Sequence, residues 1–345
     1  MVRLSLRFDL RVPPGAATSF AAQHSAMLEL AEWGERVGVA TLSLSEHHGD
    51  PAGFMSAPCV LAAAVLARTR RLRVSLAALL APLHDPVRLA EQLATLDCLG
   101  PGRLSVVLGA GYRRAELAMA GVASHERGAR VEDCVRVLRA AWTGRPFAWR
   151  GREILATPPP ATPGGPELLL GGKSVASARR AARLRCGFSP AVGALEVIAA
   201  YFEESARVGF EGAEVFGCRS LGEYRRRHPA DAPPSPGFVM LSRDPDATWR
   251  RLGPQLEADA RSYAAWQADG VVSDWAVPGA ESWQALRASG RYAIVTPEAC
   301  VALARRDGHL MLHPLAAGIE PALARESLRL LEEEVLPTLG GTAAP

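Results

Sequence analysis

The sequence predicts an α/β protein: a single (β/α)8 TIM barrel with loop insertions, occupying residues 1–345 as one domain. Three observations predict it. Short apolar runs alternate with segments of helical periodicity, eight such pairs follow one another, and the 345 residues are 48% hydrophobic. A chain of that length and hydrophobic content can bury a large core, and a barrel without insertions needs only about 250 residues. We therefore expect the surplus residues to lie in loops.

The first four strand–helix units are the most regular. The third helix begins with Pro86, whose fixed φ suits the first turn of a helix. Successive units of this kind predict parallel strands joined by right-handed crossovers. The expected strands are 4–10, 41–45, 72–79 and 104–109, and the expected helices are 24–37, 56–67, 86–98 and 126–142.

The second half of the chain repeats the pattern less regularly. An open, doubly wound sheet is the alternative fold, but the Gly109-Ala110-Gly111 turn lacks the third glycine and the downstream acid of a dinucleotide-binding fold. The expected strands are 167–170, 186–189, 238–241 and 310–313, and the expected helices are 174–184, 194–208, 246–267 and 321–336. Three stretches without a periodic pattern are the expected insertions, and such loops often serve as lids or binding loops: 145–166, 217–236 and 271–297.

Charge and composition narrow the class of partner. Lys and Arg number 39 against 36 for Asp and Glu, and a net charge of +3 gives no strong field to gather nucleic acid or coat a membrane. The longest uncharged apolar stretch near the start, 57–67, is too short to cross a bilayer, and the charged N-terminus does not resemble a signal peptide. The six cysteines show no paired spacing, which indicates reduced thiols. We expect a cytoplasmic protein without zinc or disulfides.

The residues that follow each strand are the candidates for chemistry, because barrel active sites lie at the carboxyl ends of the strands. The second strand is followed by Glu46-His47-His48, and alternation sends Glu46 and His48 to one side and His47 to the other. A histidine here can donate a proton near neutral pH. The alternative is a pair of histidines that cap the loop.

Two further strand ends have candidate binding residues. The third strand ends in small residues, including Ala77 and Ala78, which admit a flat ligand against the backbone, although the abundance of alanine explains them equally well. Beyond it, His84 beside Asp85 is either an oriented base or a loop residue whose ring bonds to the turn.

The fifth strand runs into Gly171-Gly172-Lys173-Ser174, directly before a predicted helix. The two glycines let the backbone approach an anion, the N–H groups of the helix start point at it, and the only lysine of the chain adds a charge. A phosphate group would suit this turn. The alternative is an ordinary glycine turn with a serine N-cap.

These strand ends, in this order, resemble the luciferase-like flavin monooxygenase family, which contains bacterial luciferase, alkanesulfonate monooxygenase and deazaflavin-dependent dehydrogenases. The resemblance covers nearly the whole chain, is most specific over 40–145 and is loosest over 190–300. The matching segments are 45–48, 71–74, 84–92, 96–97, 102–104, 109–112 with Glu116, 126–127, 142–144, 312–314 and 334–337.

The resemblance implies a monooxygenase that uses reduced FMN and O2 on a small organic substrate, often as a homodimer and supplied by a flavin reductase. It makes His47 the candidate catalytic acid or hydrogen-bond donor toward oxygen. The flavin would lie across the strand ends with its phosphate at the Gly171–Ser174 turn, above a non-proline cis peptide between Ala77 and Ala78. The implied cofactor-binding residues are Glu46, Ala77, Ala78, Gly109, Ala110, Gly171, Gly172, Lys173 and Ser174.

One departure from the family pattern leaves two cofactors as alternatives. Ala110 stands where the luciferase branch has arginine, which resembles relatives that use 8-hydroxy-5-deazaflavin, coenzyme F-420, for hydride transfer. Two other functions remain as alternatives. A non-catalytic flavin-binding protein would share the fold without the chemistry, and a metal-dependent hydrolase would need Glu46, His47, His48, His84 and His313 to converge.

Overall fold

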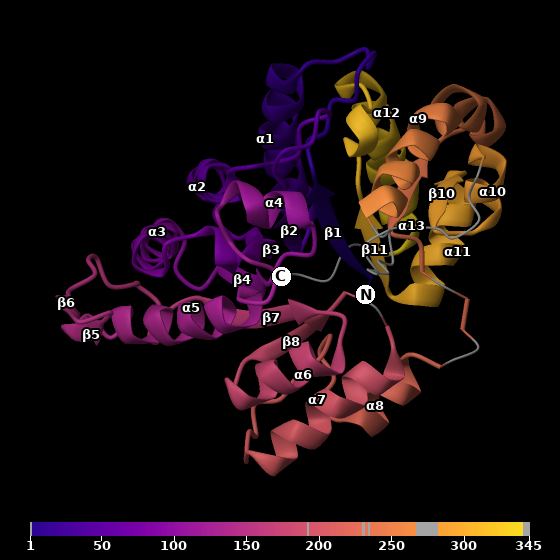
Figure 1. Cartoon of the computed structure of the whole chain (residues 1–345). Coiled ribbons are helices and arrows are strands. Elements are labelled where there is room, and N and C mark those ends of the chain that lie inside the picture. The colour runs from indigo at the N-terminus through magenta and orange to yellow at the C-terminus, as the bar shows by residue number, and fades with distance from the viewer. Residues whose placement is uncertain (1, 192, 230–231, 234, 267–281, 341–345) are drawn as a thin grey trace. The chain divides into compact units, whose positions relative to one another are not determined.

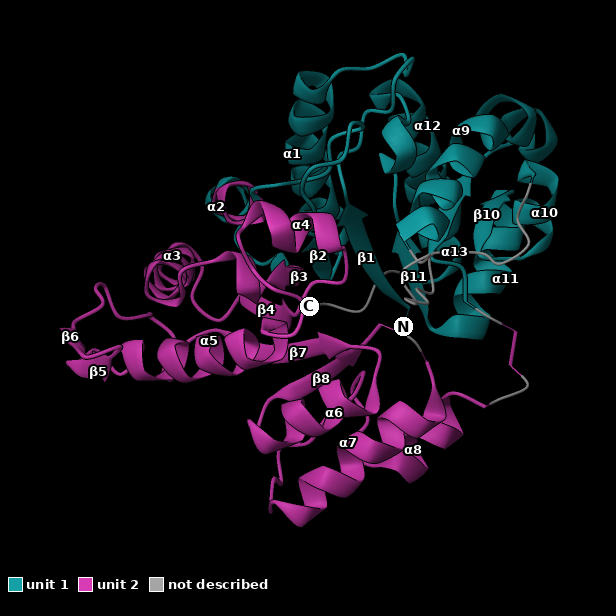
Figure 2. Cartoon of the chain, viewed as in Figure 1, with its two compact units in different colours: residues 1–57, 64–74, 234–345 teal, residues 58–63, 75–233 magenta. Residues whose placement is uncertain are grey.

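All eight predicted strands, each with its helix, are present in the computed structural model (Figure 1). The structure describes residues 2–191, 193–229, 232–233, 235–266 and 282–340. The chain divides into two compact units (Figure 2), which are residues 1–57, 64–74 and 234–345 (unit 1) and residues 58–63 and 75–233 (unit 2). The single-domain organisation stays a prediction.

Unit 1 contains a parallel sheet and the first and last helices of the chain. Its strands run in the order β11-β1-β2, and a second pair, β9 and β10, is also parallel. Helix α2 (Pro58–Arg68) and strand β3 (Arg73–Leu80) pass from one unit to the other. The elements of unit 1 are β1 Arg3–Phe8, α1 Phe20–Val37, β2 Thr41–Leu44, β9 Phe238–Leu241, α9 Pro245–Trp266, α10 Trp283–Ala288, β10 Tyr292–Val295, α11 Pro297–Asp307, β11 His309–Leu312, α12 Pro321–Leu330 and α13 Leu336–Thr338.

The register of this sheet separates an apolar face from a polar one. Leu6 lies opposite Leu42 on one side and Leu312 on the other, and all three are fully buried or nearly so. Helix α1 packs on this face so closely that a Cβ at Gly34 would come within 3.0 Å of the Leu6 Cδ1. Arg7 lies on the opposite face, because successive strand residues alternate. That polar face leads to the strand ends, where Asp9 follows β1 and His313 follows β11.

Unit 2 contains four neighbouring strands in the order β3-β4-β7-β8, of which β4, β7 and β8 are parallel. Its core includes Phe188 stacked on Tyr201 at a ring distance of 5.4 Å, and Trp142, whose Nε1 donates to the Ala90 carbonyl at 3.2 Å. The elements of unit 2 are α3 Pro86–Leu99, β4 Leu104–Gly109, α4 Arg114–Met119, α5 Arg127–Ala141, β5 Phe147–Trp149, β6 Arg152–Ile154, β7 Glu167–Gly172, α6 Val175–Arg183, β8 Gly187–Pro190, α7 Leu195–Arg207 and α8 Leu221–Arg227.

The three expected insertions contain regular structure that periodicity did not reveal. The stretch 145–166 holds the hairpin β5–β6, whose two turn residues, Arg150 and Gly151, both have positive φ (48° and 71°). Such turns usually carry Asn-Gly, so Arg-Gly gave no signal. The stretch 217–236 holds α8, and the described part of 271–297 holds α10 and β10, whereas 271–281 lie outside the described residues. Each element is too short for a periodic pattern to show.

Strand β7 extends two residues beyond its predicted end, so Gly171 and Gly172 pair with β8 as part of the sheet. Glycine disfavours strands, which is why the pattern ended at residue 170. Packing explains the glycines, since a Cβ at Gly171 would lie 3.1 Å from the Val107 Cγ1 and one at Gly172 would lie 2.4 Å from the Ser177 Cβ. Among the helices that the structure describes, none has both the length and the apolarity to cross a membrane.

Candidate active site

The residues after β2 take the orientation that strand alternation predicts. His48 Nε2 lies 3.1 Å from Glu46 Oε1, so these two side chains share one side. The Glu46 side chain is almost fully buried, and its carboxylate orients the more exposed His48. His47 faces elsewhere, and its backbone N–H donates to the Met55 carbonyl at 3.0 Å.

The His47 ring packs on an aromatic wall, which we define as Phe54, Tyr263 and Trp266. The ring centroid of His47 lies 5.1 Å from that of Phe54 and 5.1 Å from that of Trp266. The three wall residues also contact one another at ring distances of 4.9 to 6.0 Å. The predicted catalytic histidine is therefore held by apolar rings from two separate segments of unit 1.

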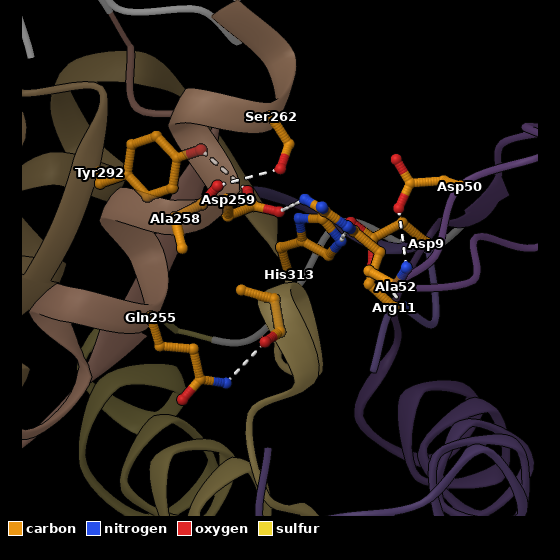
Figure 3. A network of polar contacts seen from close by, with 11 residues as sticks. Asp9, Arg11, Asp50, Ala52, Gln255, Ala258, Asp259, Ser262, Tyr292 and His313 are labelled. Atoms are coloured by element: carbon orange, nitrogen blue, oxygen red, sulfur yellow. Dashed lines mark hydrogen bonds and ion pairs between the residues drawn. The ribbon is translucent and has the colours of Figure 1, made fainter. Parts of the chain in front are cut away.

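A buried ion pair contacts the aromatic wall through Phe54, and Figure 3 shows its two members. Arg11, from the loop after β1, pairs with Asp259 of α9, and both side chains are less than 5% exposed. The Arg11 guanidinium carbon stands 4.4 Å from the centre of the Phe54 ring, and the Tyr292 hydroxyl donates to Asp259 at 3.2 Å. Sequence reasoning missed Arg11, Asp259 and Tyr292. No local pattern marks them, because their partners lie far apart in the chain.

The same network contains Asp9 and His313 at the ends of β1 and β11 (Figure 3). The Asp9 Oδ2 lies 3.6 Å from the His313 Nε2, and Asp9 Oδ1 accepts a hydrogen bond from the Arg11 backbone N–H at 3.3 Å. Burial raises the pKa of Asp9, and burial together with Arg7 lowers the pKa of His313 to about 3. His313 is consequently neutral at physiological pH.

The low pKa of His313 makes the stability of the protein depend on pH. Between pH 6.5 and about 3 the unfolded chain binds a proton at this histidine that the folded protein does not, so acidification destabilises the fold. We expect the His313→Gln variant to be less stable than the unaltered protein at pH 7.5. The difference between their free energies of unfolding should shrink by about 2–3 kcal/mol at pH 4.5, because only the unaltered protein is destabilised by protonation of this histidine. Urea unfolding at both pH values measures this, and an equal difference at the two would contradict it.

In unit 2, the peptide bond between Ala77 and Ala78 is cis, which confirms the prediction. Near the ends of β3, β4 and β7 three small residues, Ala78, Gly109 and Gly171, lie close together, with the Leu80 and Val107 side chains beside them. A Cβ built on Gly109 would lie 3.1 Å from the Ala78 Cβ, and one built on Gly171 would lie 3.9 Å from it. We call Ala78, Gly109 and Gly171 the small-residue floor. Ala110 follows it directly and adds no charge.

The turn from β7 into α6 combines a helix cap with positive charge. Ser174 Oγ accepts from the Ser177 N–H at 3.2 Å, and Ser177 Oγ accepts from the Ser174 N–H at 3.1 Å. The N-cap interpretation of Ser174 is therefore confirmed, and its own N–H is already bonded. The next two N–H groups of α6, at residues 175 and 176, have no acceptor inside the helix.

Lys173 is partly buried beside Arg127, and burial first, then the charge of Arg127, lowers the pKa of Lys173. Arg127 Nη1 in turn donates to the Gly111 carbonyl at 3.0 Å. Two cationic side chains and the start of α6 thus come together at the predicted phosphate turn.

The residues proposed for a metal site have other contacts. Among the residues that the structure describes, no three or more His, Cys, Asp or Glu side chains are grouped to hold a metal ion. Asp85, which precedes α3, is the N-cap of that helix, because its Oδ1 accepts from the N–H groups of Val87 and Arg88, each at 3.0 Å. Glu46 and His48 bind one another, as described above.

A family model described as "Luciferase-like monooxygenase" matches residues 5–293, which is most of the chain. The chain belongs to the luciferase-like monooxygenase family. It is 32% identical over 117 residues to the 4-hydroxyprotoasukamycin monooxygenase of Streptomyces nodosus subsp. asukaensis, a match that covers 34% of this chain and 32% of that protein. The chain thus spans about a third of the length of this curated relative.

Solved structures support the barrel fold of this family member. The oxygenating constituent of 3,6-diketocamphane monooxygenase from Pseudomonas putida, in complex with FMN, matches over 100% of both chains with a TM-score of 0.68 and 18% identity. An F-420-dependent secondary alcohol dehydrogenase, in complex with an F-420–acetone adduct, matches 93% of this chain and 98% of its own with a TM-score of 0.62 and 15% identity. The predicted barrel is confirmed, and the doubly wound alternative is not.

Proposed function

We propose that this chain is a flavin-dependent monooxygenase that uses reduced FMN and O2 to oxygenate a small organic substrate. The observation that carries the proposal is the small-residue floor beside the cationic turn, both within unit 2. Ala78, Gly109 and Gly171 bring no side chain of their own larger than a methyl group to these strand ends, which suits a flat ring, and the start of α6 with Lys173 offers N–H groups and charge to a phosphate. Membership of a family that includes an FMN complex supports this assignment.

Each proposed site residue has a role that follows from the chemistry of its side chain. When bound, reduced flavin supplies the electrons that activate O2, from which one oxygen atom enters the substrate and the other leaves as water. Lys173 and the N-terminus of α6 would hold the phosphate, and the small-residue floor with Ala77 and Ala110 would contact the ring. His47 donates a proton or hydrogen bond toward oxygen, and the aromatic wall keeps water from its ring. Glu46 contributes by orienting His48.

A specific observation favours a second candidate. Ala110 provides no cation in the turn after β4, and a relative of the same fold carries coenzyme F-420. A deazaflavin reacts poorly with O2, so the same residues would then support hydride transfer to or from the substrate. The floor suits either tricyclic ring, and the reaction type follows from the one that binds.

Titration of the apoprotein with reduced FMN, riboflavin and coenzyme F-420 under anaerobic conditions tests the proposal. We expect FMN to bind most tightly and riboflavin, which lacks the phosphate, to bind at least about tenfold more weakly. Lys173→Gln should remove most of that preference, because it deletes a charge at the turn. Arg152→Gln, an equal charge change on the exposed hairpin β5–β6, is the control and should leave it intact.

Each other outcome identifies a different function. Preference for coenzyme F-420 would replace oxygen insertion by hydride transfer, and flavin binding without substrate-dependent turnover across a broad panel would favour a non-catalytic binding protein. Failure to bind any flavin, together with stoichiometric zinc, would favour the metal-dependent hydrolase.

We also infer the setting in which the enzyme works. A flavin reductase would supply reduced FMN, and a homodimer is supported by apolar residues on the outer surface of α2, where Val60 is 68% exposed. The six cysteines are free thiols, which supports a reducing, cytoplasmic compartment. Balanced charge supports neither a nucleic acid nor a membrane as partner.

A further inference from the structure

Arg11 is an unusual residue to find buried. Its side chain is 3% exposed, and arginine is almost never buried without a partner. Asp259 provides the opposite charge. Apolar residues of similar size often stabilise a core as well as a buried ion pair does, so stability alone does not explain this pair. Its contacts indicate which parts of unit 1 it holds in place.

The guanidinium of Arg11 joins two segments that would otherwise be separate. One flat face lies over the Phe54 ring at 4.4 Å, in the loop after β2, and the Tyr263 ring of α9 is 5.9 Å away. Its charged end binds Asp259, which Tyr292 of β10 also holds. The planar guanidinium can lay a flat face on an aromatic ring while its edge pairs with a carboxylate, whereas the compact ammonium of lysine has no flat face.

The spacing on α9 connects this ion pair to the aromatic wall. Asp259, Tyr263 and Trp266 are separated by four and three residues, so they lie along one face of the helix. Fixing Asp259 fixes the rotation of that face and with it the direction in which Tyr263 and Trp266 point. Phe54 is fixed from the other side by Arg11.

The wall in turn sets the position of His47. Its ring contacts Phe54 and Trp266, the two wall residues that come from different segments, and the backbone hydrogen bond to Met55 ties it to the same loop. Movement of either segment would displace the ring. Displacement of a catalytic group by about 1 Å can lower a rate by about 100-fold.

We propose that Arg11 is a positioning residue for His47, acting through Phe54 and through Asp259 on α9. It does not touch the reacting atoms. The proposal rests on the proposed function only for its kinetic readout, since the position of the His47 ring can be observed in the protein without any cofactor.

Histidine ring signals in the NMR spectrum of the folded protein test this. The His47 signal, identified by its loss in His47→Gln, should move in Arg11→Lys, which keeps the charge but loses the flat stacking surface. It should also move in the double variant Arg11→Met with Asp259→Leu, which removes the stacking guanidinium, keeps all three rings of the wall and decides the matter if Arg11→Lys does not fold. The control is Asp97→Asn, because Asp97 is a buried carboxylate of unit 2 that accepts from Thr162 Oγ1 at 2.7 Å.

The kinetic readout separates positioning from general instability. With reduced flavin and substrate, Arg11→Lys and the double variant Arg11→Met with Asp259→Leu should lower kcat by about 10- to 100-fold while the flavin Kd changes less than about twofold. A His47 signal that stays in place in both variants, or that moves equally in Asp97→Asn, overturns the proposal. If the unaltered protein binds no flavin, the proposed function fails, but the NMR comparison still decides the role of Arg11.

Discussion

Replacing His47 with glutamine should lower kcat by about 100- to 10,000-fold and leave the affinity for reduced flavin within about threefold. Glutamine retains a hydrogen-bonding group of similar length but cannot transfer a proton near neutral pH. The proposed cofactor contacts of the floor and the β7–α6 turn belong to other residues, so binding should persist. Steady-state oxygenation and anaerobic flavin titration, on the same preparation, measure the two quantities.

A matched histidine substitution serves as the control for this prediction. His24 lies on the exposed side of α1, where its Nδ1 is 2.6 Å from the Phe20 carbonyl, and His24→Gln should leave kcat unchanged. A His47→Gln enzyme that retains more than about a third of wild-type kcat would contradict the assignment of His47 as the acid.

Replacing Asp259 with alanine should lower the free energy of unfolding by about 3–5 kcal/mol at pH 7. The substitution leaves the Arg11 guanidinium buried without its counter-charge and removes the acceptor of the Tyr292 hydroxyl. Urea unfolding followed by circular dichroism measures the loss. Asp246→Ala, which breaks the exposed pair with Arg287, should cost less than about 1 kcal/mol.

The double variant Arg11→Met with Asp259→Leu separates charge from packing. Because the penalty of Asp259→Ala comes mainly from an uncompensated buried charge, removing both charges should recover most of the lost stability. Catalysis should not recover with it, since methionine offers no planar surface to Phe54. A double variant as unstable as Asp259→Ala would show that the pair contributes through packing instead.

The residues after β2 and the residues after β7 differ in how much of their arrangement the sequence could predict. Alternation along β2 was enough to separate His47 from Glu46 and His48, because neighbouring residues of a strand must face opposite ways. The Lys173-Ser174 turn before α6 could also be predicted, because a lysine and an N-capping serine directly precede a segment of helical periodicity. Ser174 proved to be the N-cap of α6, which is the simpler of its two interpretations, while its role toward an anion stays a prediction.

No local sequence pattern could predict the residues that hold the His47 ring in place. Arg11 and Asp259 are 248 positions apart, and nothing in the residues around either one indicates a partner. Asp85 and His313 belong to alternative interpretations that the sequence alone left open, an oriented base and a metal site. Asp85 caps a helix, and His313 is buried and neutral beside Asp9.

What the sequence determined by itself is the order and type of the eight strand–helix units, the orientation of residues along each strand and the family to which the chain belongs. These follow from periodicity and short motifs, which depend on neighbours within a few positions. The tertiary structure alone decided that β7 continues through two glycines, that Ala78, Gly109 and Gly171 lie together near three strand ends, and that a buried ion pair contacts the aromatic wall beside His47. Those features depend on residues that are far apart in the sequence and meet only in the folded protein. Close packing and the free-energy cost of burying a charge determine which residues occur there, and neither produces a periodic pattern in the sequence.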